Sequence, residues 1–209
     1  MKNTRELFGE IDIYLFDQIL KDRFNGEMSI LDAGCGGGRN LVYFLRNGCQ
    51  VFGVDQNPQA IEQIRLLAKT LAPNLPPENF QFASVEKMPF QDECFDAVIS
   101  SAVLHFAENE RHFGKMLHEM WRVLKPEGLF FARLASSIGI ENLIESTGGG
   151  RYLLPDGSER FLVDEEFLTS TTKQFGGIWL EPLKTTNVQN LRCMTTWVLL
   201  KGSSVLIFT

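Results

Sequence analysis

A glycine-rich turn and two acidic residues form the chemically most informative feature of the sequence. The turn runs from Asp32 to Gly38 and follows residues 28–31, a short apolar run that is typical of a buried strand. Glycine permits positive φ angles and lets a ligand lie directly against the main chain. A second apolar run, 51–54, ends at Asp55. A carboxylate at that place can accept hydrogen bonds from both hydroxyls of a ribose, so the pattern indicates a nucleoside site.

The residue types in the turn distinguish between two classes of nucleoside ligand. A dinucleotide fingerprint needs glycine at three places of G-x-G-x-x-G; Gly34 and Gly36 fit, but Arg39 takes the third place. The Asp32 carboxylate would also repel a pyrophosphate. S-adenosylmethionine carries an ammonium and a sulfonium and no phosphate, so the charge pattern favours it over a nicotinamide cofactor. Asp55 suits either ligand, and its alternative role is to shape the turn before the next helix.

Four motifs in order resemble those of class I S-adenosylmethionine-dependent methyltransferases. The glycine-rich turn resembles motif I of that family, and the acid after the second apolar run resembles the end of its second strand. Residues 85–90 and 95–98 resemble the third-strand loop and the fourth strand, and residues 121–128 resemble the turn before the fifth strand. The resemblance covers roughly residues 28–135. Within the family, the chain resembles small-molecule members of the kind that includes tellurite-resistance methyltransferases.

The resemblance implies contacts to the methionine and ribose parts of the cofactor. Asp32 and the backbone of residues 34–36 would hold the methionine part, and Asp55, with Gln56 beside it, would hold the ribose. The loop that begins at Ser100 would pass beneath the sulfonium.

The contact to the adenine amino group is less well defined by the family pattern. Many members place an acidic residue near Ser84, but a serine offers only a neutral hydrogen bond, so the Val85 amide or Glu86 would share the contact to the adenine ring. The candidate cofactor residues are Tyr14, Asp32, Gly34, Cys35, Gly36, Asp55, Gln56, Ser84, Val85, Glu86 and Ser100.

Methyl transfer mainly requires that donor and acceptor are held in line and that water is excluded. Tyr14, on a first helix that would cover the site, and Phe106 are candidates for cation–π contacts to the sulfonium, with core or surface packing as the alternative. His105 is the candidate general base because a neutral imidazole exists near pH 7. Its alternative role is a hydrogen bond to a carbonyl group.

Arg133 is unusual because it interrupts an otherwise apolar strand, where a cation is seldom buried without a partner. One hypothesis is that it binds an anionic acceptor together with Arg192 and Arg151. Arg192 would reach the same place if the last strand lies antiparallel beside the fifth. The alternative is an ion pair with Glu127, Glu141 or another internal carboxylate. Arg133 and His105 are therefore the two candidate catalytic residues.

The alternation of strand and helix up to about residue 135 predicts a doubly wound α/β fold. We expect one domain over residues 1–209, with a seven-stranded, mostly parallel sheet and an antiparallel last strand. Residues 1–27 would form a helical lid, and residues 136–176 a substrate-specific insertion. The expected helices are 5–24, 39–47, 58–72, 109–124 and 164–175, and the expected strands are 28–31, 51–54, 80–83, 95–100, 129–134, 178–188 and 192–200.

Composition restricts the partners. The net charge of −6 disfavours nucleic acid, and the Pro-Pro-aromatic and Pro-Cys motifs of DNA methyltransferases are missing. No apolar run is long enough to span a bilayer, and the four dispersed cysteines indicate reduced thiols and no metal site, so a cytoplasmic monomer or homodimer is expected. A small-molecule acceptor is favoured. The alternatives are a nucleic-acid, protein or lipid methyltransferase, a non-catalytic cofactor-binding module, and a nicotinamide-dependent oxidoreductase.

Overall fold

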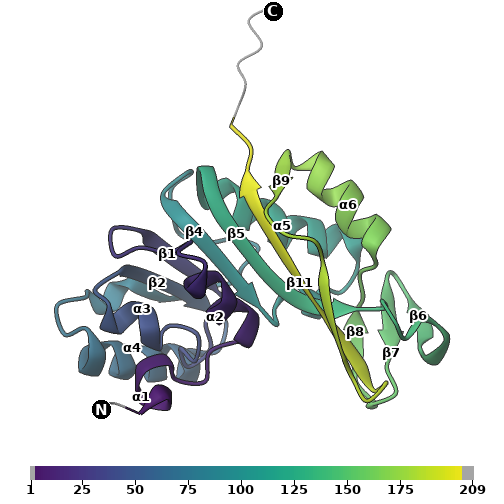
Figure 1. The fold of residues 1–209 in the computed structure, drawn as a ribbon, viewed down its shortest axis with the longest axis horizontal. Coiled ribbons are helices and arrows are strands. Elements are labelled where there is room, and N and C mark those ends of the chain that lie inside the picture. The colour runs from purple at the N-terminus through teal and green to yellow at the C-terminus, as the bar shows by residue number, and fades with distance from the viewer. Residues whose placement is uncertain (1–2, 204–209) are drawn as a thin grey trace, which may run out of the picture.

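A computed structural model describes residues 3–203 of the chain. A mixed β-sheet lies at the centre of the fold (Figure 1). Its parallel part joins five strands in the order β5-β4-β1-β2-β3. These strands are β1 (Ser29–Ala33), β2 (Gln50–Asp55), β3 (Phe80–Phe82), β4 (Phe95–Ser101) and β5 (Leu124–Ser136). Because they are parallel, their carboxyl ends meet at one edge of the sheet. Asp32 on β1 and Asp55 on β2 both lie at this edge.

Antiparallel strands extend the sheet beyond β5. The long strand β11 (Arg192–Lys201) pairs antiparallel with β5, and β10 (Lys184–Val188) and β9 (Gly177–Trp179) both pair antiparallel with β11. The expected seven-stranded, mostly parallel sheet with an antiparallel last strand is thereby confirmed, with β9 as a short addition. The expected single run 178–188 is wrong, because residues 180–183, which include Pro182, separate β9 from β10.

Alternate residues of the strands face two apolar clusters, one on each side of the sheet. Leu31, Val98 and Phe130 pack against helices α5 (Glu110–Val123) and α6 (Glu165–Gln174), whereas their neighbours Ile30, Ile99 and Phe131 pack against the other cluster. That second cluster includes residues of α2 (Ile13–Leu20), α3 (Val42–Arg46) and α4 (Pro58–Leu71). None of the helices within residues 3–203 combines the length and the apolar character needed to cross a bilayer.

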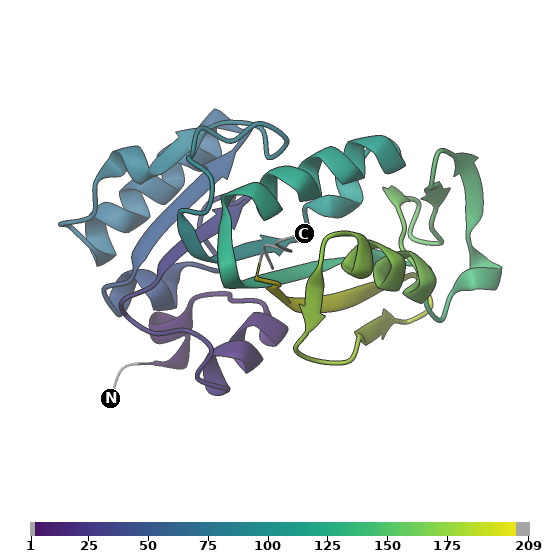
Figure 2. The same ribbon diagram turned by 90° about the horizontal axis from the view of Figure 1, so that it is seen from above.

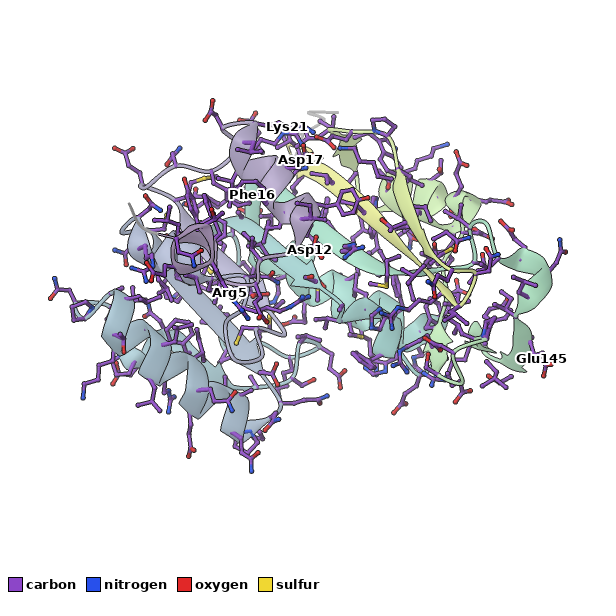
Figure 3. The ribbon with its side chains drawn as sticks, turned by 60° about the horizontal axis from the view of Figure 1, so that its bottom comes forward. Arg5, Asp12, Phe16, Asp17, Lys21 and Glu145 are labelled. Atoms are coloured by element: carbon purple, nitrogen blue, oxygen red, sulfur yellow. The ribbon has the colours of Figure 1, made fainter. Side chains whose placement is uncertain are left out.

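The N-terminal region differs from the single helix expected over 5–24. Helix α1 (Thr4–Phe8) ends at Gly9, which has a φ of 65°, and α2 begins after Asp12, whose side chain accepts a hydrogen bond from the Tyr14 amide. Figure 3 shows Asp12 at the start of α2, next to the sheet. Residues 1–2 of the expected lid and 204–209 of the expected domain lie outside the described residues.

Residues 136–176 contain a small second sheet before α6. Its strands are β6 (Glu145–Gly148), β7 (Arg151–Leu153) and β8 (Glu159–Phe161), joined in that order as antiparallel hairpins. Figures 1 and 2 both show this sheet at one end of the molecule. Short 3-10 turns occur at Pro77–Asn79, Leu104–Phe106 and Glu141–Leu143. The hairpins place part of the expected insertion near the carboxyl end of β5, where Ser136 bridges to Val163.

Close packing of the glycine-rich turn against α4 gives a stability prediction. Gly38 has a φ of 86°, and a Cβ there would lie 2.1 Å from Cδ1 of Ile64. Gly48 has a φ of 74° but open space around it. We expect Gly38→Ala to lower the free energy of unfolding by about 2 kcal/mol more than Gly48→Ala, since only the first adds overpacking to backbone strain. Equal losses in urea denaturation would contradict the packing described here.

Candidate functional site

The glycine-rich turn is held against the end of β2 by its own backbone. The amides of Gly34 and Cys35 both donate to the Val54 carbonyl at 2.9 Å, and the Gly36 amide donates to Oδ2 of Asp55 at 2.8 Å. Gly34 has a φ of 87°, and a Cβ at this position would lie 2.4 Å from Cγ2 of Val103. Only glycine therefore allows the turn and the loop after β4 to approach each other this closely.

Asp32, the last residue but one of β1, carries a buried carboxylate that the described residues do not satisfy. Its side-chain Oδ2 has no hydrogen-bond partner among residues 3–203. Burial raises the pKa of Asp32 to about 7; the positive charge of Arg39 opposes this shift and the negative charge of Asp55 adds to it. On the neighbouring strand β4, the Ser100 hydroxyl is also buried and has no hydrogen-bond partner in the described part of the chain. A cationic group placed here would restore the charge of Asp32 and compensate its burial.

Asp55 is oriented by two backbone amides at the end of β2. Its Oδ2 accepts from Gly36 and its Oδ1 accepts from Asn57, both at 2.8 Å. Asp55 thus shapes the turn before α4, which is the alternative role that the sequence indicated for it. Each carboxylate oxygen can accept a further hydrogen bond, so the same side chain remains able to bind two hydroxyls.

A cavity of about 240 Å³ lies beside this turn. We call it the glycine-turn cavity; its lining residues are Gly34, Asp55, Gln56, Ala83, Ser84, Val85, Glu86, Ala102, Val103, Phe106, His112 and Met116. Six of the predicted cofactor residues are thus brought together by three strand ends: Gly34 after β1, Asp55 and Gln56 at β2, and 84–86 after β3. Their assignment to a cofactor stays a prediction.

Other predicted cofactor residues do not line this cavity. The Cys35 side chain points into the core, where its sulfur lies next to Gly53, and burial raises the pKa of the thiol. Tyr14 lies elsewhere: its hydroxyl is 2.8 Å from that of Thr186 on β10. The expectation that Tyr14 covers the cofactor is therefore not matched by its position.

Two features of the glycine-turn cavity were not anticipated from the sequence. His112, on α5, contacts the Glu86 carboxylate through Nε2, and Met116 lies one turn further along the same helix. A helical periodicity shows which residues share a face but not which cavity that face meets, so no signal marked these two residues. Phe106 does line the cavity, as an aromatic candidate for a sulfonium contact would require.

A second cavity, of about 410 Å³, opens between the ends of β5 and β11 and the small sheet. We call it the arginine cavity; its lining residues are Ala102, His105, Arg133, Ala135, Leu154, Asp156, Ser158, Arg160, Val188, Arg192 and Met194. Ala102 also lines the glycine-turn cavity, so the two cavities meet at this residue. Four lining residues come from 136–176, and the substrate-specific role of that segment stays a prediction.

Arg133 lines the arginine cavity but also forms an internal ion pair. Its Nη1 lies 2.8 Å from Oδ2 of Asp12, whose side chain is only 1% exposed. The guanidinium carbon is 5.1 Å from the centre of the Tyr14 ring. The ion-pair alternative is thus realised with Asp12, and not with Glu127 or Glu141, and it ties α2 to β5.

The other predicted arginines are divided between two places. Arg192 lines the arginine cavity, because β11 lies antiparallel beside β5, and its Nη1 is 3.7 Å from Oδ2 of Asp156. Arg151 does not line it: its side chain donates to the Ala107 carbonyl and pairs with Glu159. The neighbouring strand supplies Arg160 instead, which the sequence did not single out.

His105 is buried and its imidazole is oriented by β5. The Ala135 amide donates to its Nδ1 at 3.2 Å, so the proton of the neutral ring is on Nε2. Burial, together with the charge of Arg160, lowers the pKa of His105 to about 4. The ring is therefore neutral near pH 7, as expected, but has no free lone pair. This geometry does not favour the predicted general base.

The chain is similar in sequence to known methyltransferases. Residues 31–132 match a family model described as a methyltransferase domain. The chain is 38% identical to the thiol S-methyltransferase TMT1B of Rattus norvegicus over 130 residues, which are 61% of this chain and 48% of the relative. The chain spans about half the length of the curated relatives it matches.

Solved structures show the same fold at low sequence identity. A Burkholderia thailandensis 1,6-didemethyltoxoflavin-N1-methyltransferase with bound S-adenosylhomocysteine has a TM-score of 0.66 at 19% identity and covers 88% of this chain and 76% of its own. The cyclase SpnF has a TM-score of 0.69 at 17% identity, covering 91% and 81%. Residues 31–132 form a methyltransferase domain that resembles those of class I S-adenosylmethionine-dependent methyltransferases.

The raised pKa of Asp32 predicts how this residue affects stability with pH. The folded state holds the proton up to about pH 7, whereas the unfolded state loses it near pH 4, so burial of Asp32 costs stability as pH rises between these values. We therefore compare the free energy of unfolding of Asp32→Asn with that of the unmodified protein. We expect this difference to shift in favour of the variant by up to about 4 kcal/mol as the pH rises from 4 to 8. Urea denaturation at several pH values measures this difference, and a constant difference would contradict the unpaired carboxylate.

The ion pair between α2 and β5 gives a further stability prediction. Asp12→Asn keeps the helix cap but leaves the charge of Arg133 without its partner. We expect a loss of about 3 kcal/mol in the free energy of unfolding. In an Arg133→Met background, the same substitution should cost much less. Equal losses in the two backgrounds would show that the two residues do not interact.

Proposed function

We propose that the protein transfers a methyl group from S-adenosylmethionine to a small-molecule acceptor. The observation that carries this proposal is the buried Oδ2 of Asp32, at the first position of the glycine-rich turn, which has no hydrogen-bond partner among residues 3–203. A buried carboxylate of this kind suits a ligand that brings a positive charge and excludes one that brings a pyrophosphate. The site therefore favours a cationic nucleoside.

The described residues fit the parts of S-adenosylmethionine. Asp32 would pair with the ammonium group of the methionine part. Asp55, already held by two amides, would accept the ribose hydroxyls. The glycine-turn cavity would take the adenosine, with residues 84–86 beside the adenine. We assign the adenine amino contact to Glu86 or the Val85 backbone.

S-adenosylmethionine supplies a methyl group that is already activated by a positively charged sulfur. The protein then has to orient the acceptor and keep water away. Ala102, where the two cavities meet, marks the place between donor and acceptor, and Phe106 presents an aromatic face on the donor side. The arginine cavity would hold the acceptor.

The size of the arginine cavity supports a small-molecule acceptor. The names of the two methyltransferase relatives point the same way, since one acts on thiols and the other carries bound 1,6-didemethyltoxoflavin. The cyclase SpnF has a similar fold, so the fold alone does not define the reaction. All four cysteines are free thiols, which agrees with a place in the reducing cytoplasm.

Cofactor binding tests this proposal directly. We expect S-adenosylhomocysteine to bind in calorimetry, and Asp32→Asn to weaken its affinity at pH 8 by about 10- to 100-fold, since a hydrogen bond to a charged group is lost. Asp22→Asn, an exposed position after α2, is the matched control and should leave the affinity unchanged.

Radiolabelled methyl transfer to a panel of thiols, phenols, carboxylic acids and chalcogen oxyanions then identifies the acceptor class. Absence of any binding at millimolar S-adenosylhomocysteine would reject the proposal.

A further inference from the structure

One of the arginines that line the arginine cavity forms no ion pair with any carboxylate of residues 3–203. Of its three arginines, Arg133 pairs with Asp12 and Arg192 pairs with Asp156. Arg160 forms no ion pair within residues 3–203; its Nη1 donates to the Glu159 carbonyl, and its guanidinium lies 5.0 Å from the centre of the Phe106 ring. Arg160 is only partly exposed, so its charge acts in an environment that is not fully screened by water.

His105 adds a hydrogen-bond donor to the same cavity. Its Nδ1 is occupied by the Ala135 amide, and its Nε2 has no partner in the described part of the chain. Because the proton is on Nε2, the ring offers a hydrogen to an acceptor in the cavity and no lone pair. The ring of Phe106 contacts both groups, since its centre lies 4.6 Å from that of the His105 ring.

The side chains described around this cavity include only one weak base. The titratable and charged groups that line it are His105, Arg133, Asp156, Arg160 and Arg192. Asp156 is the only carboxylate among them; hydrogen bonds from Ser158 and the charges of the nearby arginines lower its pKa. Three cations, one weakly basic carboxylate and the neutral donor His105 therefore surround this space.

We propose that the methyl acceptor binds as an anion and reacts through its ionised atom, with Arg160 as the counter-charge and the Nε2 hydrogen of His105 orienting it. The acceptor class is a small organic acid, either a thiolate or a carboxylate. This inference rests on the proposed methyl transfer. It replaces Arg133 and Arg151 by Arg160 as the principal anion-binding residue.

The reaction balances without a proton transfer inside the protein. A bond forms between the methyl carbon and the ionised sulfur or oxygen of the acceptor, and the bond between that carbon and the sulfonium breaks. The electron pair of the broken bond stays on the departing sulfur, which becomes a neutral thioether. The acceptor also becomes neutral, so the attraction to Arg160 disappears once the product has formed, and this favours product release.

Equilibrium binding tests the counter-charge independently of turnover. Benzoate and benzamide have nearly the same shape but differ in charge. We expect the protein to bind benzoate at least tenfold more tightly than benzamide in calorimetry, and Arg160→Gln to remove this preference while Arg160→Lys retains part of it. Arg111→Gln, an exposed position on α5, is the control and should keep the preference. Equal binding of the two probes, no binding of either at millimolar concentration, or a preference that survives Arg160→Gln would overturn the proposal.

The pH dependence of turnover tests the absence of a base. Thiophenol and 4-nitrothiophenol differ in the pKa of their thiols. We expect the acid limb of kcat/KM for the acceptor, measured at saturating S-adenosylmethionine, to follow the pKa of each thiol, because the acceptor ionises before it binds. A limb at the same pH for both thiols would reveal a base on the protein and contradict the inference. If S-adenosylhomocysteine does not bind, the proposed function fails, whereas the benzoate comparison still tests the arginine cavity.

Discussion

The site depends on one unfavourable interaction, the burial of the Asp32 carboxylate without a partner. Moving a carboxylate away from water is costly unless a charge or hydrogen bonds compensate it, and the described residues leave one oxygen of Asp32 unsatisfied. The rise of its pKa to about 7 expresses that cost. A cationic ligand would remove it, so the same feature that weakens the isolated protein supports our proposal of a positively charged nucleoside as the ligand.

The fold supplies this position through the parallel part of its sheet. The carboxyl ends of β1, β2 and β3 bring the glycine-rich turn, Asp55 and residues 84–86 to one edge. The antiparallel strand β11 reaches the same edge from the opposite direction, so its first residues join the end of β5. The glycine-turn cavity, which we propose for the nucleoside, and the arginine cavity, which we propose for the acceptor, then meet at Ala102.

Sequence reasoning predicted the parts of the site that depend on local motifs. The glycine-rich turn, Asp55 and residues 84–86 follow strand ends, and parallel strands gather such residues at one edge. The break between β9 and β10 also had a signal, Pro182, that the prediction of one long strand overlooked.

Contacts between distant segments could not be predicted in the same way. The partner of Arg133 is Asp12, 121 residues away, and nothing in either segment points to the other. The choice of Arg160 over Arg151 depends on how two short strands present their side chains. The role of His105 depends on which ring nitrogen meets the Ala135 amide. These features are set by packing and register, which a single sequence does not reveal.

Proton release on ligand binding tests the central claim most directly. At pH 6 a group with a pKa near 7 is about nine-tenths protonated, so binding of the ammonium group of S-adenosylhomocysteine to Asp32 should release about 0.9 proton. Calorimetry in two buffers with different ionisation enthalpies measures this number. The account predicts that the release falls toward zero as pH rises above 8 and disappears at pH 6 in Asp32→Asn. Binding at pH 6 without proton release in the unmodified protein would contradict it.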